Sequence, residues 1–156
     1  MILREANEND IKRIAELEKI CFPTEPWSEN MIKADIVDND QATYYVCDMS
    51  DEGVPKEQAV VGYVGVWQIL DEGHITNVAI APEYRRRHIA ESLILVMMTQ
   101  TLKKGVKSWT LEVRASNEAA INLYTKRGFL AEGIRRGYYQ DNNEDAIIMW
   151  WRAGTK

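Results

Sequence analysis

The chain has little cysteine and histidine, with only two of each among its 156 residues. Cys21 and Cys47 can form at most one disulfide and show no metal-ligand spacing. We therefore expect free, largely buried thiols, as in a reducing compartment, and no metal site. No run approaches the ~18 apolar residues of a membrane span, and no apolar stretch follows a basic start. These absences exclude a disulfide scaffold and predict a cytoplasmic protein with no signal peptide, membrane anchor or membrane partner.

The sequence also lacks low-complexity segments, Pro/Ser-rich linkers and visible repeats. With 46% hydrophobic residues it is long enough for one compact core, so we expect a single domain over residues 1–156. A net charge of −5, with one short basic cluster at residues 85–87, disfavours direct binding to nucleic acid. Residues 1–57 carry 14 acidic and 6 basic side chains, and residues 58–156 carry 10 and 13. This asymmetry either favours a cationic acceptor and a phosphate-bearing cofactor or reflects two solvated faces.

Hydrophobic periodicity predicts alternating strands and helices, and therefore an α+β protein with one mixed sheet. Ser28 is typical of a helix cap, and Gly105 and Gly128 suit the residue after a last helical turn. A hairpin turn is predicted at residues 71–73, which read Asp-Glu-Gly. The predicted strands are Ile2–Arg4, Ala42–Cys47, Ala59–Ile69, His74–Ala81, 107–113, 129–138 and 145–151, and the predicted helices are Asp10–Ile20, Ser28–Val37, 87–104 and 117–127.

The most informative segment is residues 78–91, where an apolar strand passes through a tight basic turn into an amphipathic helix. Such a turn directs backbone N–H groups and a helix N-terminus toward one point, which favours bound anionic oxygens. It matches neither Gly-x-Gly-x-x-Gly nor Gly-x-x-x-x-Gly-Lys-Ser/Thr. Residues 85–90, Arg-Arg-Arg-His-Ile-Ala, instead resemble the acyl-CoA loop of the GNAT N-acetyltransferases, Gln/Arg-x-x-Gly-x-Gly/Ala. Alone, the segment is equally typical of an ordinary basic helix start.

His88 stands where that family has glycine. Glycine at this position normally lets the backbone come close to the phosphates. A side chain is tolerated there if the residue already sits at the helix start with a negative φ.

Further segments are similar, in order and spacing, to the RimI branch of the GNATs, the ribosomal-protein alanine N-acetyltransferases. They cover most of the chain and are far more specific together than the loop alone. They are Phe-Pro at 22–23, Pro-Trp-Ser-Glu at 26–29, Leu-Glu-Val-Arg-Ala-Ser-Asn at 111–117, Ala-Ile-x-Leu-Tyr at 120–124, Gly-Phe at 128–129, Ile-Arg-Arg-Gly-Tyr-Tyr at 134–139 and Glu-Asp-Ala-Ile-Ile-Met at 144–149.

The resemblance implies the GNAT fold, a central sheet splayed between its fourth and fifth strands and flanked by helices. Those strands are His74–Ala81 and Lys107–Val113 here. In the family, the pantetheine arm of acetyl-CoA lies in the splay and pairs with the backbone of the fourth strand, and no metal is needed. The cofactor contacts implied are Val78, Ala79, Ile80, Arg86, Arg87, His88, Ile89, Ala90, Glu91 and Asn117. Burial in the core also explains the three strand residues, and a helix cap explains Asn117 almost as well.

Two residues match the catalytic pair of the RimI branch. Glu112 ends an otherwise apolar strand, where partial burial is expected to raise its pKa toward the working pH, as a general base requires. The alternative is a structural salt bridge with Arg114 or another arginine. Tyr124 matches the family's proton donor, and a phenol with a pKa near 10 is suited to protonating the CoA thiolate. The alternative for Tyr124 is a core aromatic.

The acceptor implied by the resemblance is the N-terminal alanine of small-subunit ribosomal protein eighteen, or another basic protein N-terminus. A carboxylate base handles an α-amine, with a pKa near 8, more easily than a lysine near 10.4. Trp27, Tyr138 and Tyr139 fall in segments that border the acceptor groove in similar proteins. Two alternatives stay open, a GNAT acting on a small amine and a CoA-binding module without turnover. We expect a monomer or a weak dimer.

Overall fold

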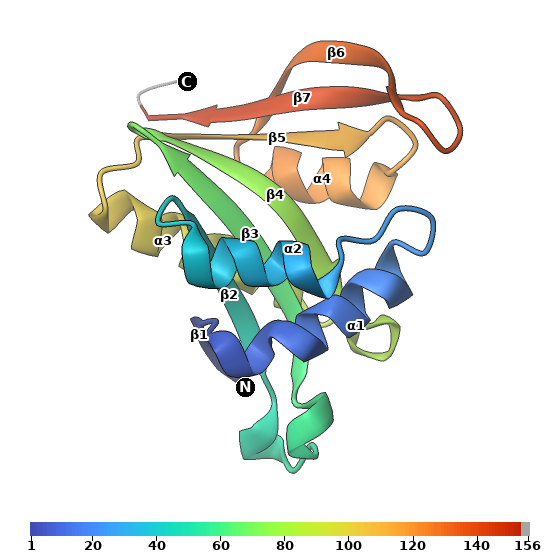
Figure 1. The fold of residues 1–156 in the computed structure, drawn as a ribbon. Coiled ribbons are helices and arrows are strands. Elements are labelled where there is room, and N and C mark those ends of the chain that lie inside the picture. Colours follow the sequence, from blue (N-terminus) through green and yellow to red (C-terminus); the bar gives the residue numbers. More distant parts are fainter. Residues whose placement is uncertain (154–156) are drawn as a thin grey trace.

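The computed structural model describes residues 1–153, which fold into alternating strands and helices around one sheet (Figure 1). Figure 1 shows α1 and α2 in front of the sheet and α3 behind it. The strands are β1 Ile2–Glu5, β2 Ala42–Asp48, β3 Val60–Ile69, β4 Glu72–Ile80, β5 Ser108–Arg114, β6 Leu130–Tyr139 and β7 Glu144–Arg152. The helices are α1 Ile11–Cys21, α2 Glu29–Lys33, α3 Ile89–Lys103 and α4 Glu118–Lys126, with short turns η1 Glu8–Asp10, η2 Ala34–Asp38, η3 Ser50–Glu52, η4 Lys56–Gln58 and η5 Pro82–Tyr84.

Within residues 1–153 the seven strands follow the order β1-β2-β3-β4-β5-β7-β6. Every neighbouring pair is antiparallel except β4 and β5, which run parallel. The predicted α+β class with a mixed sheet is therefore confirmed. The core lies between the sheet and the helices, where Ile14, Leu17, Val64, Leu93 and Met97 are fully buried.

The two parallel strands separate soon after they meet. β4 and β5 pair only from Glu72 to His74 on one strand and from Ser108 to Thr110 on the other. Beyond His74, β4 remains paired with β3 on its other side as far as Ile80. The edge of β4 that faces β5 is thus open over most of its length, and the predicted splay is confirmed.

Several helix boundaries follow from their predicted signals. The Ser28 side chain accepts a hydrogen bond from the Met31 N–H and caps α2, and Gly105 and Gly128 have left-handed φ values of 96° and 97°. The single helix predicted over Ser28–Val37 was wrong in its second half, because α2 gives way to a wider π-type turn at η2. There Asp35 is buried and its carboxylate accepts hydrogen bonds from Tyr44 Oη at 2.8 Å and from Trp67 Nε1 at 3.1 Å.

The hairpin between β3 and β4 turns one residue earlier than the glycine signal predicted. Ile69 pairs with Glu72, so the turn consists of Leu70 and Asp71. Gly73 lies in β4, where an added Cβ would stand 2.6 Å from Cδ1 of Trp109. Glycine is therefore needed at position 73 for close packing against Trp109, and not for the turn.

Both thiols are free, with Cys47 buried and Cys21 half-buried. Over residues 1–153, no helix is long and apolar enough to cross a membrane. The same residues contain no group of three or more His, Cys, Asp or Glu side chains placed to hold a metal ion.

Candidate active site

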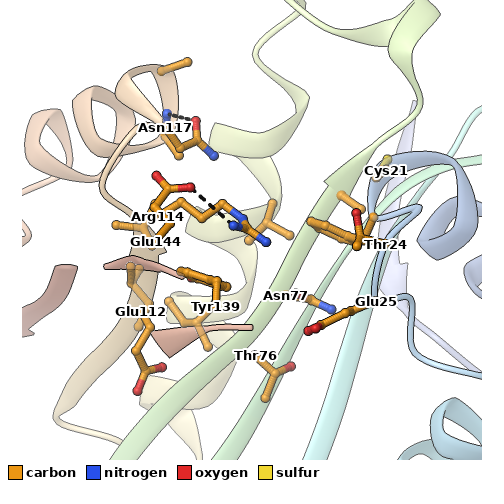
Figure 2. Close-up of a pocket in the computed structure, with 18 of the residues that line it drawn as sticks. Cys21, Thr24, Glu25, Thr76, Asn77, Glu112, Arg114, Asn117, Tyr139 and Glu144 are labelled. Carbon is orange, nitrogen blue, oxygen red and sulfur yellow. Dashed lines mark hydrogen bonds and ion pairs between the residues drawn. The ribbon is translucent and has the colours of Figure 1, made fainter. Parts of the chain in front are cut away.

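A cavity of about 1110 Å³ occupies the splay between β4 and β5 (Figure 2). Its walls come from β4, β5, α4, the loop between α1 and α2, and the loop between β6 and β7. The cavity brings together most of the residues predicted from sequence, although they are spread over more than a hundred positions. Those that line it are Trp27, Val78, Ala79, Ile80, Ala90, Glu112, Asn117, Tyr124, Tyr138 and Tyr139.

A second cavity of about 270 Å³ lies at the start of α3. It shares Ile80 and Ala90 with the large cavity, so the two are neighbours. Arg86, His88, Ile89 and Glu91 complete the predicted residues that line it. Arg87 lines neither cavity, because its guanidinium stacks over the Tyr84 ring at 4.9 Å from the centroid.

The loop before α3 has an unusual backbone. Arg86 and His88 both take left-handed conformations, with φ values of 63° and 60°. The negative φ under which a side chain is readily tolerated is therefore not found at His88, which adopts the conformation that favours glycine at a modest energetic cost. Its side chain is 80% exposed, so the imidazole points into solvent and leaves the loop interior to the backbone.

The N-terminus of α3 differs from those of α2 and α4. Ser28 and Asn117 cap α2 and α4 with their side chains, whereas the N-cap of α3, His88, makes no such hydrogen bond. The first N–H groups of α3 are therefore donors that an anion can satisfy. The carboxylate of Glu91 does not compete with such an anion as a free charge, because it pairs with Arg127 and lies 3.9 Å from Lys126 Nζ.

Arg85 was not predicted as a site residue, yet it lines both cavities. Its Nε donates to the Ile80 carbonyl oxygen at 3.2 Å, and its Nη2 lies 3.6 Å from Cys21 Sγ. The Cys21 thiol also contacts the Ile80 carbonyl at 3.4 Å. This carbonyl is thus already satisfied by the protein, while the side chain of Arg85 places a positive charge between the two cavities. Its place at the first position of the Gln/Arg-x-x-Gly-x-Gly/Ala pattern is the signal that could have separated it from its two basic neighbours.

Glu112 lies on β5, two residues after the last residue that pairs with β4. Its Oε2 is 3.3 Å from His74 Nε2, and its Oε1 is 3.4 Å from Arg135 Nε. Hydrogen bonding to His74, with a further contribution from Arg135, outweighs partial burial and lowers the pKa of Glu112. The predicted rise in this pKa was wrong, because the sequence did not reveal either partner.

Of the alternative salt-bridge partners for Glu112, Arg114 or another arginine, the structure shows Arg135, while Arg114 points elsewhere. It pairs with Asp141 at 2.9 Å and with Glu144 at 3.3 Å (Figure 2), and its guanidinium lies 4.0 Å from the centroid of the Tyr139 ring. Burial raises the pKa of Tyr139 to about 12. This cluster fixes the β6–β7 loop against the end of β5. Tyr138 packs edge-on against Tyr139 and is 48% exposed.

Tyr124 lies on the buried face of α4 and lines the large cavity. Its ring packs against Phe129, with centroids 5.7 Å apart, and only 7% of the residue is exposed. Burial raises its pKa, so the phenol stays protonated at neutral pH and retains a proton to donate. On the same helix, Asn117 both lines the cavity and caps α4, accepting from the Ala120 N–H at 3.2 Å.

The opposite wall is held by Glu18 on α1, which was not predicted as a site residue. Glu18 is fully buried, and its carboxylate accepts hydrogen bonds from the Trp27 backbone N–H at 2.8 Å, Asn77 Nδ2 at 2.9 Å and Tyr63 Oη. Desolvation raises its pKa. This carboxylate joins the α1–α2 loop, β3 and β4 at the cavity. A charged residue among apolar helix positions was the only sequence signal.

Together, the splayed parallel strands, the uncapped helix start behind a basic loop and the ionisable pair on β5 and α4 define the fold of a CoA-dependent acyltransferase. Residues 11–129 match the model of the family described as Acetyltransferase (GNAT) family. The chain belongs to this family, and the predicted enzyme class, an N-acetyltransferase, is confirmed.

Relatives agree with the resemblance seen in the sequence. The chain is 37% identical over 148 residues to a Bacillus subtilis (strain 168) protein named as a candidate ribosomal protein bS18-alanine N-acetyltransferase, covering 95% of this chain and 93% of the relative. The crystal structure of the ribosomal-protein-S18-alanine N-acetyltransferase from Escherichia coli is similar with a TM-score of 0.83 and 28% identity, covering 99% and 95% of the two chains.

A more distant similarity concerns the fold alone. Arabidopsis thaliana NAA60 in complex with acetyl-CoA has a TM-score of 0.88 at 18% identity, and the match covers 99% of both chains.

Proposed function

We propose that the protein transfers the acetyl group of acetyl-CoA directly to the α-amine of an N-terminal alanine, that of ribosomal protein bS18. We infer that residues 1–156 act as one domain and work in the cytoplasm, as a monomer or weak dimer. The single observation that carries the proposal is the cavity in the splay, which has Glu112 on its β5 wall and Tyr124 on its α4 wall. The names of the Bacillus and Escherichia relatives support the choice of acceptor.

The cofactor side of the proposal rests on backbone groups. Apart from the Ile80 carbonyl, which Arg85 and Cys21 already satisfy, the open edge of β4 over Val78–Ile80 offers backbone groups to an extended amide-bearing arm, as a further strand would. The pyrophosphate is proposed to lie in the smaller cavity, against the uncapped N-terminus of α3 and the backbone of residues 86–91. Arg85 supplies positive charge to the same place.

The chemistry requires removal of a proton from the amine, attack on the thioester and protonation of the departing thiolate. Glu112 is proposed to accept the amine proton through a bridging water molecule, and Tyr124 to protonate the sulfur of CoA. As the amide bond forms, the thioester carbon–sulfur bond breaks and no covalent enzyme intermediate is involved. Holding the amine and the thioester together in one cavity supplies much of the rate.

The acceptor is proposed to enter between the α1–α2 loop and the β6–β7 loop. Trp27 stands on the first side and Tyr138 and Tyr139 on the second. The acidic side chain of Glu25 lines the same cavity on the first side, which favours a basic peptide. Asn117, the N-cap of α4, is proposed to contact the cofactor in addition to capping the helix.

The test uses two synthetic basic peptides that begin with alanine, one with a free α-amine and one with that amine blocked. Each is incubated with acetyl-CoA and the protein, and the product mass is read. We expect one added acetyl group on the free-amine peptide alone. Acetylation of spermidine or an aminoglycoside in place of the peptide would favour a small-amine enzyme. Binding of acetyl-CoA with no transfer to any amine would favour a binding module.

A further inference from the structure

A histidine contacts the proposed base, although the two residues are 38 positions apart in the sequence. His74 is the last residue of β4 that pairs with β5, and its Nε2 lies 3.3 Å from Oε2 of Glu112. Glu112 lines the large cavity, whereas His74 does not. The imidazole side chain is 39% exposed and the carboxylate side chain only 16%. His74 therefore connects a shielded carboxylate with solvent outside the cavity.

The other groups around this pair come from four strands. Arg135 on β6 reaches across β7 to the second carboxylate oxygen, Oε1. Glu72, two residues before His74, adds a negative charge near the imidazole. Across the sheet, His74 faces the uncharged Trp67 on β3 and Thr110 on β5. Among the side chains that contact the Glu112 carboxylate, His74 alone can take a proton from it near neutral pH, because arginine stays protonated.

We propose that His74 is the proton outlet of the active site: it accepts at Nε2 the proton that Glu112 has taken from the acceptor amine and releases a proton to solvent. This inference rests on the proposed acetyl transfer. The amine N–H bond breaks as the amide bond forms, the proton passes to the carboxylate and then to the imidazole, and water receives it. No electrons are exchanged, and the leaving thiolate is protonated separately by Tyr124.

The outlet works only while His74 is neutral at Nε2. The hydrogen bond to Glu112 raises the pKa of His74 above its usual value near 6.5. Below that pKa the imidazolium holds Glu112 in an ion pair and cannot take a second proton. Activity that depends on the outlet is therefore lost as the pH falls through the pKa of His74, and it is fully present above it.

The test compares kcat of the wild-type protein and of His74→Gln on the alanine peptide between about pH 5.5 and 9. Dividing one kcat by the other at each pH cancels the ionisation of the peptide. We expect the wild type to be about tenfold faster at high pH, less than the full effect of an acid–base residue because water can still carry the proton. The ratio should fall toward one at low pH. In His74→Ala, added imidazole should restore part of the loss.

Glu72→Gln is the matched control, because it removes the neighbouring charge and keeps the imidazole. Its kcat should stay within about twofold of the wild type and imidazole should have no effect. A His74→Gln ratio that is the same at every pH, with no rescue by imidazole, would overturn the outlet while leaving acetyl transfer intact. A wild-type protein that acetylates no peptide at any pH would instead overturn the proposed function, and the outlet with it.

Discussion

Replacing Tyr124 by phenylalanine separates a catalytic phenol from a core aromatic. The residue is 7% exposed and its ring packs on Phe129, contacts that phenylalanine preserves. Within residues 1–153 no hydrogen bond supports the phenol, so its loss should change the free energy of unfolding by less than about 1 kcal/mol. If the phenol protonates the CoA thiolate, kcat should fall by about 10²–10⁴-fold, roughly 3–5 kcal/mol of transition-state stabilisation.

The assay is the steady-state rate of CoA release with the alanine peptide, beside urea unfolding and the Kd for acetyl-CoA. Tyr45→Phe is the matched control: Tyr45 is 2% exposed, its hydroxyl is buried without a partner among residues 1–153, and it does not line the cavity. Its kcat should not change. A Tyr124→Phe protein that folds normally and keeps kcat within about threefold of the wild type would refute the role of the phenol.

Three further changes test the fold and the cofactor loop. Gly73→Ala puts a Cβ 2.6 Å from Trp109 and should lower the free energy of unfolding, measured in urea, by about 1–3 kcal/mol. Gly133→Ala, whose nearest neighbouring atom is at 3.4 Å, should leave the free energy of unfolding unchanged. Equal losses of stability in the two variants would contradict the close packing of Gly73 against Trp109. The pKa of Glu144 is lowered to about 2, first by hydrogen bonds to Ser116, so its stabilisation is complete above its unfolded-state pKa near 4.3 and is lost as the pH falls toward 2. In Glu144→Gln, the free energy of unfolding measured in urea should change less with pH over that range than in the wild type. The same pH dependence in both proteins would contradict the role of Glu144. His88→Gly should leave the Kd for acetyl-CoA, measured by calorimetry, unchanged or up to about threefold tighter, because the imidazole is 80% exposed and glycine favours φ 60°; weaker binding would show that the imidazole takes part.

The sequence was sufficient where the signals are local. Helix caps such as Ser28, the glycine at 128 and the period of the apolar residues correctly predicted most elements, and the resemblance to the GNAT family predicted the splay between β4 and β5. The second half of the helix after Ser28 differed because Asp35 is drawn into contact with Tyr44 and Trp67, which come from later strands. Such tertiary hydrogen bonds have no signature in the local sequence.

In the candidate site, too, local motifs were predictable from the sequence and contacts between distant strands were not. The residues that line the cavity were predicted by their motifs, but the electrostatics of Glu112 were not, because His74 and Arg135 come from other strands. A carboxylate at the end of an apolar strand suggests a raised pKa, and its contacts with His74 and Arg135 reverse the direction. The φ of His88 also escaped prediction, since sequence alone does not distinguish a helical start from a left-handed one.

The central claim is transfer to an α-amine, and a peptide that offers both kinds of amine tests it most directly. A basic peptide with an N-terminal alanine and an internal lysine is incubated with acetyl-CoA and the protein, and tandem mass spectrometry locates the added acetyl group. The account predicts acetylation of the alanine α-amine and an untouched lysine. Acetylation of the lysine side chain, or of neither amine while acetyl-CoA binds, would contradict it.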